Sequence, residues 1–383
     1  MISKHFFRAA ILFVILLSAA CQESEQKMNI GAIYNLTGEQ QNLDIPSSQG
    51  ALLAVDELNS NGGILGRIVN LILEDGETNT SVIARKTEAM IDANSDMPVL
   101  IGMSDTDVVL AAAQVAAKHE RLFITSGATS PLLPKQVPNF LFLACYGDNV
   151  QAAAAAEWAI ESLKVSKVAV LFKQGMSYTE LLRKYFVTRY NELGGTLTLD
   201  KGYTTDNFQN YLGDLGDAEL VFLSASPDEV VSEVSQLRDA GVTIPILSGD
   251  GFDIGEGWQK LPEEHNSYFT THADVGADNT TPAVIAFRAA FTKKYPGHEP
   301  DAFTALGYDT VNLVAAAIEK AGSTDVLAVR DALSNLQNFQ GITGKISFNA
   351  GNPIPVKSVA LVKADKGSEK LVEEILPTNV PAP

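Results

Sequence analysis

The sequence predicts an α/β protein of two doubly wound lobes, each built on a mostly parallel sheet. Strand-like and helix-like segments alternate from Met28 onward, and this pattern restarts near Asn149. Without its N-terminal leader the chain has about 360 residues, a length typical of roughly two domains. Two such units in one chain predict a cleft between them, where ligands of α/β folds usually bind.

The first unit opens with a mostly apolar strand at Ile30–Leu36. A helix follows, with Ser47 or Ser48 as its N-cap, apolar residues at i, i+3, i+4 and i+7, and a pair of glycines just past its end. The next elements alternate in the same way: strand Ile68–Leu73, helix Val82–Ala93, strand Val99–Gly102, helix Val108–Lys118 and strand Leu122–Thr125. This alternation predicts a mostly parallel sheet.

The second unit repeats this order. Its segments are helix Val150–Leu163, strand Val168–Phe172, helix Tyr178–Leu193, strand Thr196–Leu199, strand Leu220–Leu223, helix Pro227–Ala240 and strand Ile244–Leu247. Helices Pro282–Tyr295 and Thr304–Ala321, with strand Val359–Lys363, complete the fold. The proline-rich end at Pro377–Pro383 is expected to be a flexible, frayed tail.

The N-terminus has the pattern of an export signal. Two basic residues precede the apolar run Ala9–Leu17, which is too short to span a bilayer. The run ends in Leu-Ser-Ala-Ala-Cys at Cys21, which resembles a bacterial lipobox, in which the cysteine is lipidated and the chain is cut before it. We therefore predict a lipoprotein signal peptide at 1–20, lipidation of Cys21 and a tether at 21–27. The exported protein would then be anchored to a membrane through lipid and face the periplasm or the cell exterior. The alternative is an ordinary secretory signal with an incidental cysteine.

Charge and cysteine content exclude other classes of protein. The whole chain has a net charge of −18 and no run rich in lysine or arginine, so nucleic acid is not expected as a partner. Of its 2 cysteines, Cys21 is the lipidation candidate, and Cys145 is left without a partner for a disulfide bond. Stability is therefore expected to come from buried cores.

An enzyme is the main rival class. The sequence has no Gly-x-Ser-x-Gly, His-Glu-x-x-His, Walker or dinucleotide-binding pattern. Cys145 is expected to be a buried, inert thiol rather than a nucleophile. The histidines after the leader have no metal-ligand spacing; they are His119, His265, His272 and His298. No catalytic residue, metal or cofactor is therefore expected.

Two polar loops follow strands of the first unit. Met103–Asp107 opens a helix, and Ser126–Ser130 follows the next strand. Short hydroxyls beside free backbone N–H groups at a helix start can bind a carboxylate. Plain N-capping explains either loop alone, but two such loops after successive strands favour a shared anion site.

In the second unit, Asp250 follows strand Ile244–Leu247 and lies between Gly249 and Gly251. The flanking glycines leave its side chain room to project into a cleft, where it could bind an ammonium group. The alternative is an Asx-turn residue. An anion site on one lobe that faces an acid on the other would suit a zwitterion.

Several short motifs occur in a fixed order along the chain. They are Leu36-Thr37-Gly38, Gly50-Ala51, Asn61-Gly62-Gly63-Ile64, Ile101-Gly102, Ser126-Gly127-Ala128-Thr129, Gly249-Asp250-Gly251, Tyr295-Pro296-Gly297, Tyr308-Asp309-Thr310, Ala321-Gly322-Ser323-Thr324-Asp325 and Gly341-Ile342-Thr343-Gly344. In this order they resemble the branched-chain amino-acid binding proteins of ABC transporters, over essentially Met28 to Pro377.

The resemblance implies a type I periplasmic-binding fold, in which two lobes are joined by a three-crossover hinge. Lobe 1 would comprise 28–147 and 275–347, and lobe 2 would comprise 148–274 and 348–376. The expected partners are a small-molecule ligand, with an amino acid favoured, and a membrane permease. A sensor that signals to another protein instead of feeding transport is the alternative.

The resemblance also implies a set of ligand-binding residues. The hydroxyls that bind an α-carboxylate match Thr106 and Thr129, and the acid that takes the α-amino group matches Asp250. Tyr178 matches a tyrosine after a strand of lobe 2, and Leu43 stands where the family commonly has tyrosine. The full candidate set is Leu43, Ser104, Thr106, Gly127, Ala128, Thr129, Tyr146, Tyr178 and Asp250.

Other positions depart from the family pattern. An aromatic residue of some members is replaced by Ala225 or Ser226. Asp105 and Asp107 flank Thr106, where small neutral residues are usual. These two acids would repel a carboxylate unless they point away as helix caps, so a ligand that lacks a carboxylate stays open.

Overall fold

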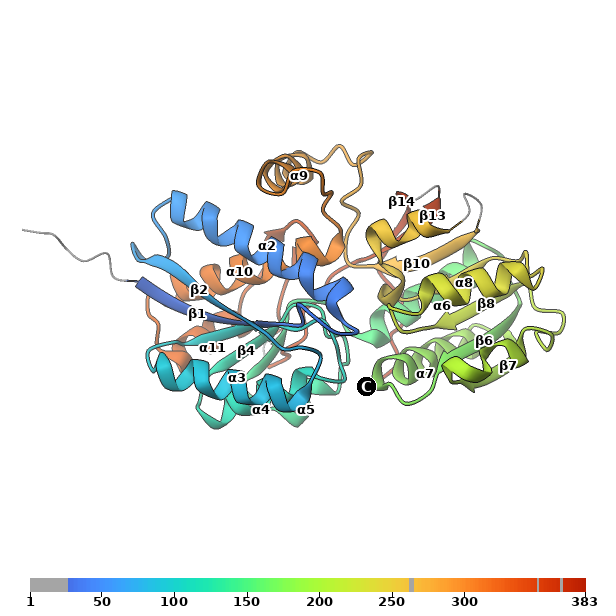
Figure 1. Cartoon of the computed structure of the whole chain (residues 1–383), viewed down its shortest axis with the longest axis horizontal. Helices are drawn as coiled ribbons and strands as arrows, with labels where there is room; N and C mark the ends of the chain where they lie inside the picture. The colour runs from blue at the N-terminus through green and yellow to red at the C-terminus, as the bar shows by residue number, and fades with distance from the viewer. Residues whose placement is uncertain (1–26, 262–264, 350, 366–367) are drawn as a thin grey trace, which may run out of the picture.

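The computed structural model describes residues 27–261, 265–349, 351–365 and 368–383. It contains two α/β lobes that lie side by side (Figure 1). The predicted signal peptide, Cys21 and the tether up to residue 26 lie outside the described residues. Within the described ranges, none of the helices is both long and apolar enough to cross a bilayer.

Lobe 1 is built on a five-stranded parallel sheet. The strand order is β2 (Ile68–Asp75), β1 (Lys27–Tyr34), β3 (Val99–Gly102), β4 (Leu122–Thr125) and β5 (Leu141–Leu143). Alternate residues of β1 point to opposite faces of the sheet. Ile30 and Ala32 belong to the hydrophobic core on one face, and Ile33 belongs to the core on the other. Both faces are therefore buried, as a parallel sheet requires.

Helices cover both faces of this sheet (Figure 1). One face carries α2 (Gln41–Ser60), α10 (Ala302–Ala321) and α11 (Val326–Ser334), and the other carries α3 (Thr80–Ala93) and α4 (Val109–Lys118). The smaller elements are α5 (Leu133–Gln136), α9 (Pro282–Lys294) and a hairpin of β11 (Phe339–Gly341) and β12 (Gly344–Ile346).

Lobe 2 is built on a seven-stranded sheet. Its order is β14 (Ser368–Ile375), β13 (Val359–Asp365), β10 (Ser267–Thr271), β9 (Ile246–Ser248), β8 (Leu220–Ser224), β6 (Lys167–Lys173) and β7 (Thr196–Tyr203). Only β13 and β14 run antiparallel to their neighbours among these described strands. The helices are α6 (Asp148–Glu161), α7 (Ser177–Glu192) and α8 (Val230–Asp239), with 3-10 turns at Thr205–Tyr211, Asp250–Phe252 and Gly255–Lys260.

The chain crosses between the lobes three times. It passes from β5 to α6, from β10 to α9, and from β12 to β13. The predicted α/β class with two mostly parallel-sheet lobes and three crossovers is thus confirmed.

Helices α2 and α10 of lobe 1 touch at two glycines. A Cβ added to Gly50 would lie 1.8 Å from the carbonyl oxygen of Thr304. A Cβ added to Gly307 would lie 1.8 Å from that of Ser47. These two positions set how closely the helices approach, because any side chain there would meet backbone.

Helix α2 begins earlier than the sequence indicated. Its first residue is Gln41 rather than one next to Ser47 or Ser48, and Pro46 lies inside it. The additional turn is held by a tertiary contact, since the buried Asp44 Oδ2 accepts a hydrogen bond from the backbone N–H of Asn35 at 2.7 Å. A cap pattern cannot reveal such a contact.

The C-terminal segment also differs from expectation. Instead of fraying, Thr378 donates its backbone N–H to both carboxylate oxygens of Glu157 on α6, at 2.9 and 3.1 Å. Asn149 donates its side-chain amide to the carbonyl oxygen of Pro381 at 2.9 Å. Because Glu157 also pairs with the buried Arg189, the chain end joins a partly buried ionic cluster of lobe 2.

Candidate functional site

A small cavity lies between the two lobes. Its volume is about 290 Å³ including the part open to solvent, at the low end for ligand sites. Lobe 1 contributes Gln40, Leu43, Ser104, Asp105, Thr106 and Thr129, and lobe 2 contributes Met176, Tyr178, Pro227, Asp250 and Gly251. Polar groups from both lobes therefore face one space.

Most of the candidate set lines this cavity. Leu43, Ser104, Thr106, Thr129, Tyr178 and Asp250 do so. Three candidates, Gly127, Ala128 and Tyr146, do not line it. A Cβ added to Gly127 would lie 3.0 Å from the Phe303 ring and from the Ser104 side chain, and the Ala128 carbonyl accepts a hydrogen bond from the Cys145 thiol. Tyr146 stacks on His272 with ring centroids 4.2 Å apart, and so packs against a residue that contacts Asp250.

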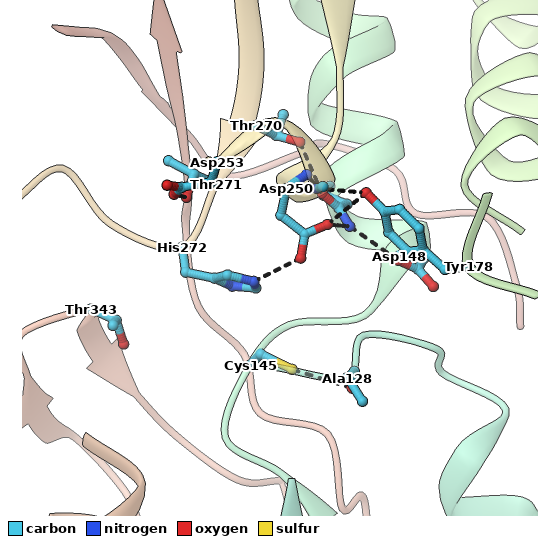
Figure 2. Close-up of polar contacts among 12 residues, drawn as sticks. Ala128, Cys145, Asp148, Tyr178, Asp250, Asp253, Thr270, Thr271, His272 and Thr343 are labelled. Atoms are coloured by element: carbon cyan, nitrogen blue, oxygen red, sulfur yellow. Dashed lines mark hydrogen bonds and ion pairs between the residues drawn. The ribbon is translucent and has the colours of Figure 1, made fainter. Parts of the chain in front are cut away.

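Asp250 is the centre of a buried hydrogen-bond network in lobe 2 (Figure 2). Its Oδ1 accepts from the Tyr178 hydroxyl at 3.0 Å and from the Gln151 amide at 2.7 Å. Its Oδ2 lies 3.0 Å from His272 Nε2. Burial lowers the pKa of His272, which favours the neutral form of the ring. Three side chains thus fix the direction of the Asp250 carboxyl group.

Gln151 of α6 uses both ends of its amide to hold Asp250. Its nitrogen donates to Asp148 Oδ1 at 3.0 Å and to Asp250, and its oxygen accepts from the Asp250 backbone N–H and the Thr270 hydroxyl, each at 3.0 Å. This buried residue was missed by the sequence reasoning, as were His272 and the lining residues Gln40, Met176, Pro227 and Gly251. Gln151 lies in an alanine-rich helix that gives no local sign of a polar role.

The polar loops of lobe 1 approach each other at the cavity. Ser130 donates its backbone N–H to the Thr106 hydroxyl oxygen at 3.3 Å, which ties the two loops together. Ser104 and Thr129 are both buried and line the same space. Three hydroxyls in one wall are suited to donate to an anionic group.

The two acids beside Thr106 have different environments. Asp105 Oδ1 accepts the backbone N–H of Asp107 at 2.5 Å, so it caps its own turn while it also lines the cavity. Asp107 instead turns to the other lobe and accepts the backbone N–H of Ser177 at 2.8 Å. The condition under which these acids would not repel a carboxylate, that both point away as caps, is met by Asp107 and only in part by Asp105.

Buried carboxyls surround the cavity. Burial raises the pKa of Asp44 and of Asp105 to about 7. Burial, followed by repulsion from Asp250, raises the pKa of Asp148 to about 8. Near neutral pH these groups hold protons that aspartates of an unfolded chain, with pKa values near 3.9, have lost.

We expect the ligand-free protein to lose thermal stability as pH rises from 6.5 to 8. The folded state binds more protons than the unfolded chain over this range, so the free energy of unfolding falls with pH. The lowered pKa of His272 makes stability rise with pH only below about 6.5. The lowered pKa of Lys357, about 8, begins to oppose the loss near the upper end of this range. Melting temperatures at constant ionic strength are the measurement. Asp148→Asn should flatten the slope, and a melting temperature that rises with pH in both proteins would contradict this assignment.

One surface group has the composition of a metal site. Among the residues that the structure describes, Glu88, Asp92 and His119 form the group whose potential ligand atoms lie within 4.8 Å of one another. Glu88 already bonds His119 at 2.9 Å and Lys118 at 3.1 Å. A lysine ammonium beside the carboxylate disfavours a bound cation, so these contacts account for the group.

Comparison with known proteins matches nearly the whole chain to periplasmic binding proteins. A family model described as "Periplasmic binding protein" matches residues 27–369. The Leu/Ile/Val-binding protein BraC3 of Rhizobium johnstonii is 28% identical over 347 residues, which cover 89% of this chain and 92% of that protein.

Two solved structures resemble the whole fold. One is the branched-chain amino acid transporter substrate binding protein LivJ from Streptococcus pneumoniae in complex with isoleucine, with a TM-score of 0.83, 27% identity and coverage of 92% of this chain and 100% of that one. The other is a leucine binding protein LivK from Thermotoga maritima, with a TM-score of 0.81, 26% identity and coverage of 91% and 99%.

Proposed function

Since this chain belongs to the periplasmic binding protein family, as its motif order predicted, we propose that it captures an amino acid between its lobes and delivers it to an ABC transporter permease. Members of this family bind substrates and are not enzymes, in agreement with the absence of catalytic motifs from the sequence. Relatives named for leucine, isoleucine and valine support an amino acid as the ligand class.

The observation that supports this proposal most is the division of polar groups across the cavity. The hydroxyls of Thr106 and Thr129 line it from lobe 1, and the carboxylate of Asp250 lines it from lobe 2. A zwitterion would place its carboxylate at the hydroxyls and its ammonium at Asp250. Both ends are satisfied together only when the lobes are closed, which couples binding to closure.

The remaining lining favours a small ligand with an aliphatic part. Leu43, Met176 and Pro227 add apolar surface to the cavity, and no aromatic side chain other than Tyr178 lines it among the described residues. Asp105 adds an acid to the same wall, so an amino acid whose side chain carries a second amino group is also compatible with the site.

The test is identification of the ligand. Mild unfolding of the freshly purified protein, followed by mass spectrometry of the released small molecules, should yield an amino acid. Calorimetry with L-leucine, L-isoleucine, L-valine and the other common amino acids should then give micromolar or tighter binding for at least one of them. A released ligand without an α-amino group, together with no binding across the panel, would overturn the proposal.

We further propose that the protein is a lipoprotein anchored through Cys21 and held away from the membrane by the predicted tether at 21–27, whose last residue, Lys27, is the first residue of β1. Each methylene of an acyl chain contributes about 0.8 kcal/mol of membrane binding, so two or three chains give a firm anchor. Cys21→Ser should move the protein from the membrane fraction to the soluble extract. A variant that stays in the membrane fraction would contradict lipidation at this residue.

A further inference from the structure

Helix α7 of lobe 2 begins without a cap from its own segment. Its N-cap residue is Met176, which makes no side-chain hydrogen bond to the first turn. A thioether is a weak acceptor, and the first N–H groups of any helix lack partners within the helix. The N–H groups of Ser177 and Tyr178 therefore need a partner from elsewhere.

Asp107 of lobe 1 supplies this partner. Its Oδ1 accepts the N–H of Ser177 at 2.8 Å, and its Oδ2 accepts the N–H of Tyr178 at 3.3 Å. The carboxylate thus faces the end of α7 where the helix dipole favours negative charge. Asp107 is exposed, so water and salt screen the attraction and keep its effect moderate.

This contact links two parts of the candidate site. Thr106, the neighbour of Asp107, lines the cavity from lobe 1. Tyr178, at the start of α7, lines it from lobe 2, donates its hydroxyl to Asp250 and accepts the N–H of Gly251 at 2.8 Å. Tyr178 and Asp250 both belong to lobe 2, so a separation of the lobes would carry them away from Thr106 together.

We propose that Asp107 is a positioning residue, which caps α7 across the cleft and so favours the closed arrangement, in which Tyr178 and Asp250 of lobe 2 face Thr106 of lobe 1. When the lobes separate, the two N–H groups exchange the carboxylate for water. The contact shifts the open–closed balance by the difference in free energy between the N–H groups bound to the carboxylate and the same groups bound to water. This inference goes beyond the proposed function, since it applies to any ligand enclosed by the lobes.

The test measures the two amides directly. Hydrogen exchange at Ser177 and Tyr178 is followed in the full-length protein, with and without L-leucine as the probe. The variants are Asp107→Ala, which removes the acceptor, and Asp107→Asn, which keeps one because asparagine caps helices about as well as aspartate. Asp214→Asn removes the same charge at an exposed site of lobe 2 and is the matched control.

The expected result is exchange about fivefold faster at both amides in Asp107→Ala, an effect typical of a lost N-cap. Asp107→Asn should keep protection at one of the two amides, because its side chain has one acceptor oxygen, and Asp214→Asn should stay near wild type at both. Small-angle scattering should show a larger radius of gyration for Asp107→Ala than for Asp107→Asn.

Two results would overturn the proposal. One is equal exchange at Ser177 and Tyr178 in the wild type and Asp107→Ala, with or without the probe. The other is faster exchange with no difference in radius of gyration, which would make Asp107 a cap without an effect on closure. Failure of L-leucine to bind any variant would count against the proposed ligand instead, and the exchange of ligand-free protein would still decide the role of Asp107.

Discussion

Asp250→Ala should weaken amino-acid binding by at least about a hundredfold, on the order of 3 kcal/mol. Hydrogen bonds to charged groups contribute about 1.5–3 kcal/mol each, and an ammonium buried without its partner costs more. The loss should be large because Gln151, Tyr178 and His272 hold this carboxylate in place before a ligand arrives. Calorimetry with the amino acid that the panel identifies is the measurement.

Two comparisons separate lost charge from a damaged fold. Asp250→Asn keeps the shape of the side chain, and it should still lose most of the affinity because the charge is gone. Thr129→Ala should lose only about tenfold, since backbone donors remain near the carboxylate. Circular dichroism should show that all three variants are folded. If Asp250→Ala binds like the wild type while Thr129→Ala does not, the ligand has no ammonium at Asp250, and the amino-acid assignment fails.

Gly50→Ala should destabilise lobe 1 by at least about 2 kcal/mol, even though alanine favours helices by up to about 1 kcal/mol over glycine. The added Cβ would lie 1.8 Å from the carbonyl oxygen of Thr304, so α2 and α10 must separate. Ala51 and Ala54 of α2 and Val311 and Val314 of α10 belong to one hydrophobic cluster, which would then lose contacts. Thermal unfolding should show a melting temperature lower by about 5 °C or more.

Gly307→Ala should behave like Gly50→Ala, because its Cβ would meet the Ser47 carbonyl from the opposite helix. Gly213→Ala is the matched control, since no atom lies within 4 Å of a Cβ there and its backbone has no positive φ. Its melting temperature should stay within about 1 °C of the wild type. Equal stability of all three variants would mean that the helices do not pack as closely as described.

The strands that the sequence located best are those buried on both faces. Val99–Gly102 and Leu122–Thr125 match β3 and β4 to the residue, because short apolar runs bounded by polar loops mark central parallel strands. Strands β10 and β14 were not expected. Strand β14 lies at the sheet edge and carries exposed charges, so its sequence has no continuous apolar run. Its position is set by pairing with β13, and a local sequence pattern does not reveal which strands will pair.

Some residues of the site could be identified from their local sequence, and others could not because their roles depend on tertiary contacts. The hydroxyl loops and Asp250 could be identified because polar residues after parallel strands meet at one edge of a sheet. Gln151 and His272 could not, because their roles depend on which side chains fold against Asp250. Asp107 shows the same limit, since its local pattern indicates a cap for α4, and its actual partner is a helix of the other lobe.

Cys145 gives the protein a practical use as a ligand reporter. Its side chain is fully buried, its thiol donates to the Ala128 carbonyl, and burial raises its pKa far above the ordinary value. Maleimide dyes react with the thiolate, so this cysteine should stay unmodified in the folded protein. In a Cys21→Ser background, a cysteine introduced at the rim of the cleft would then be the single site that takes a dye. Lobe closure around the solute could be read as a change in fluorescence without removal of any native core residue.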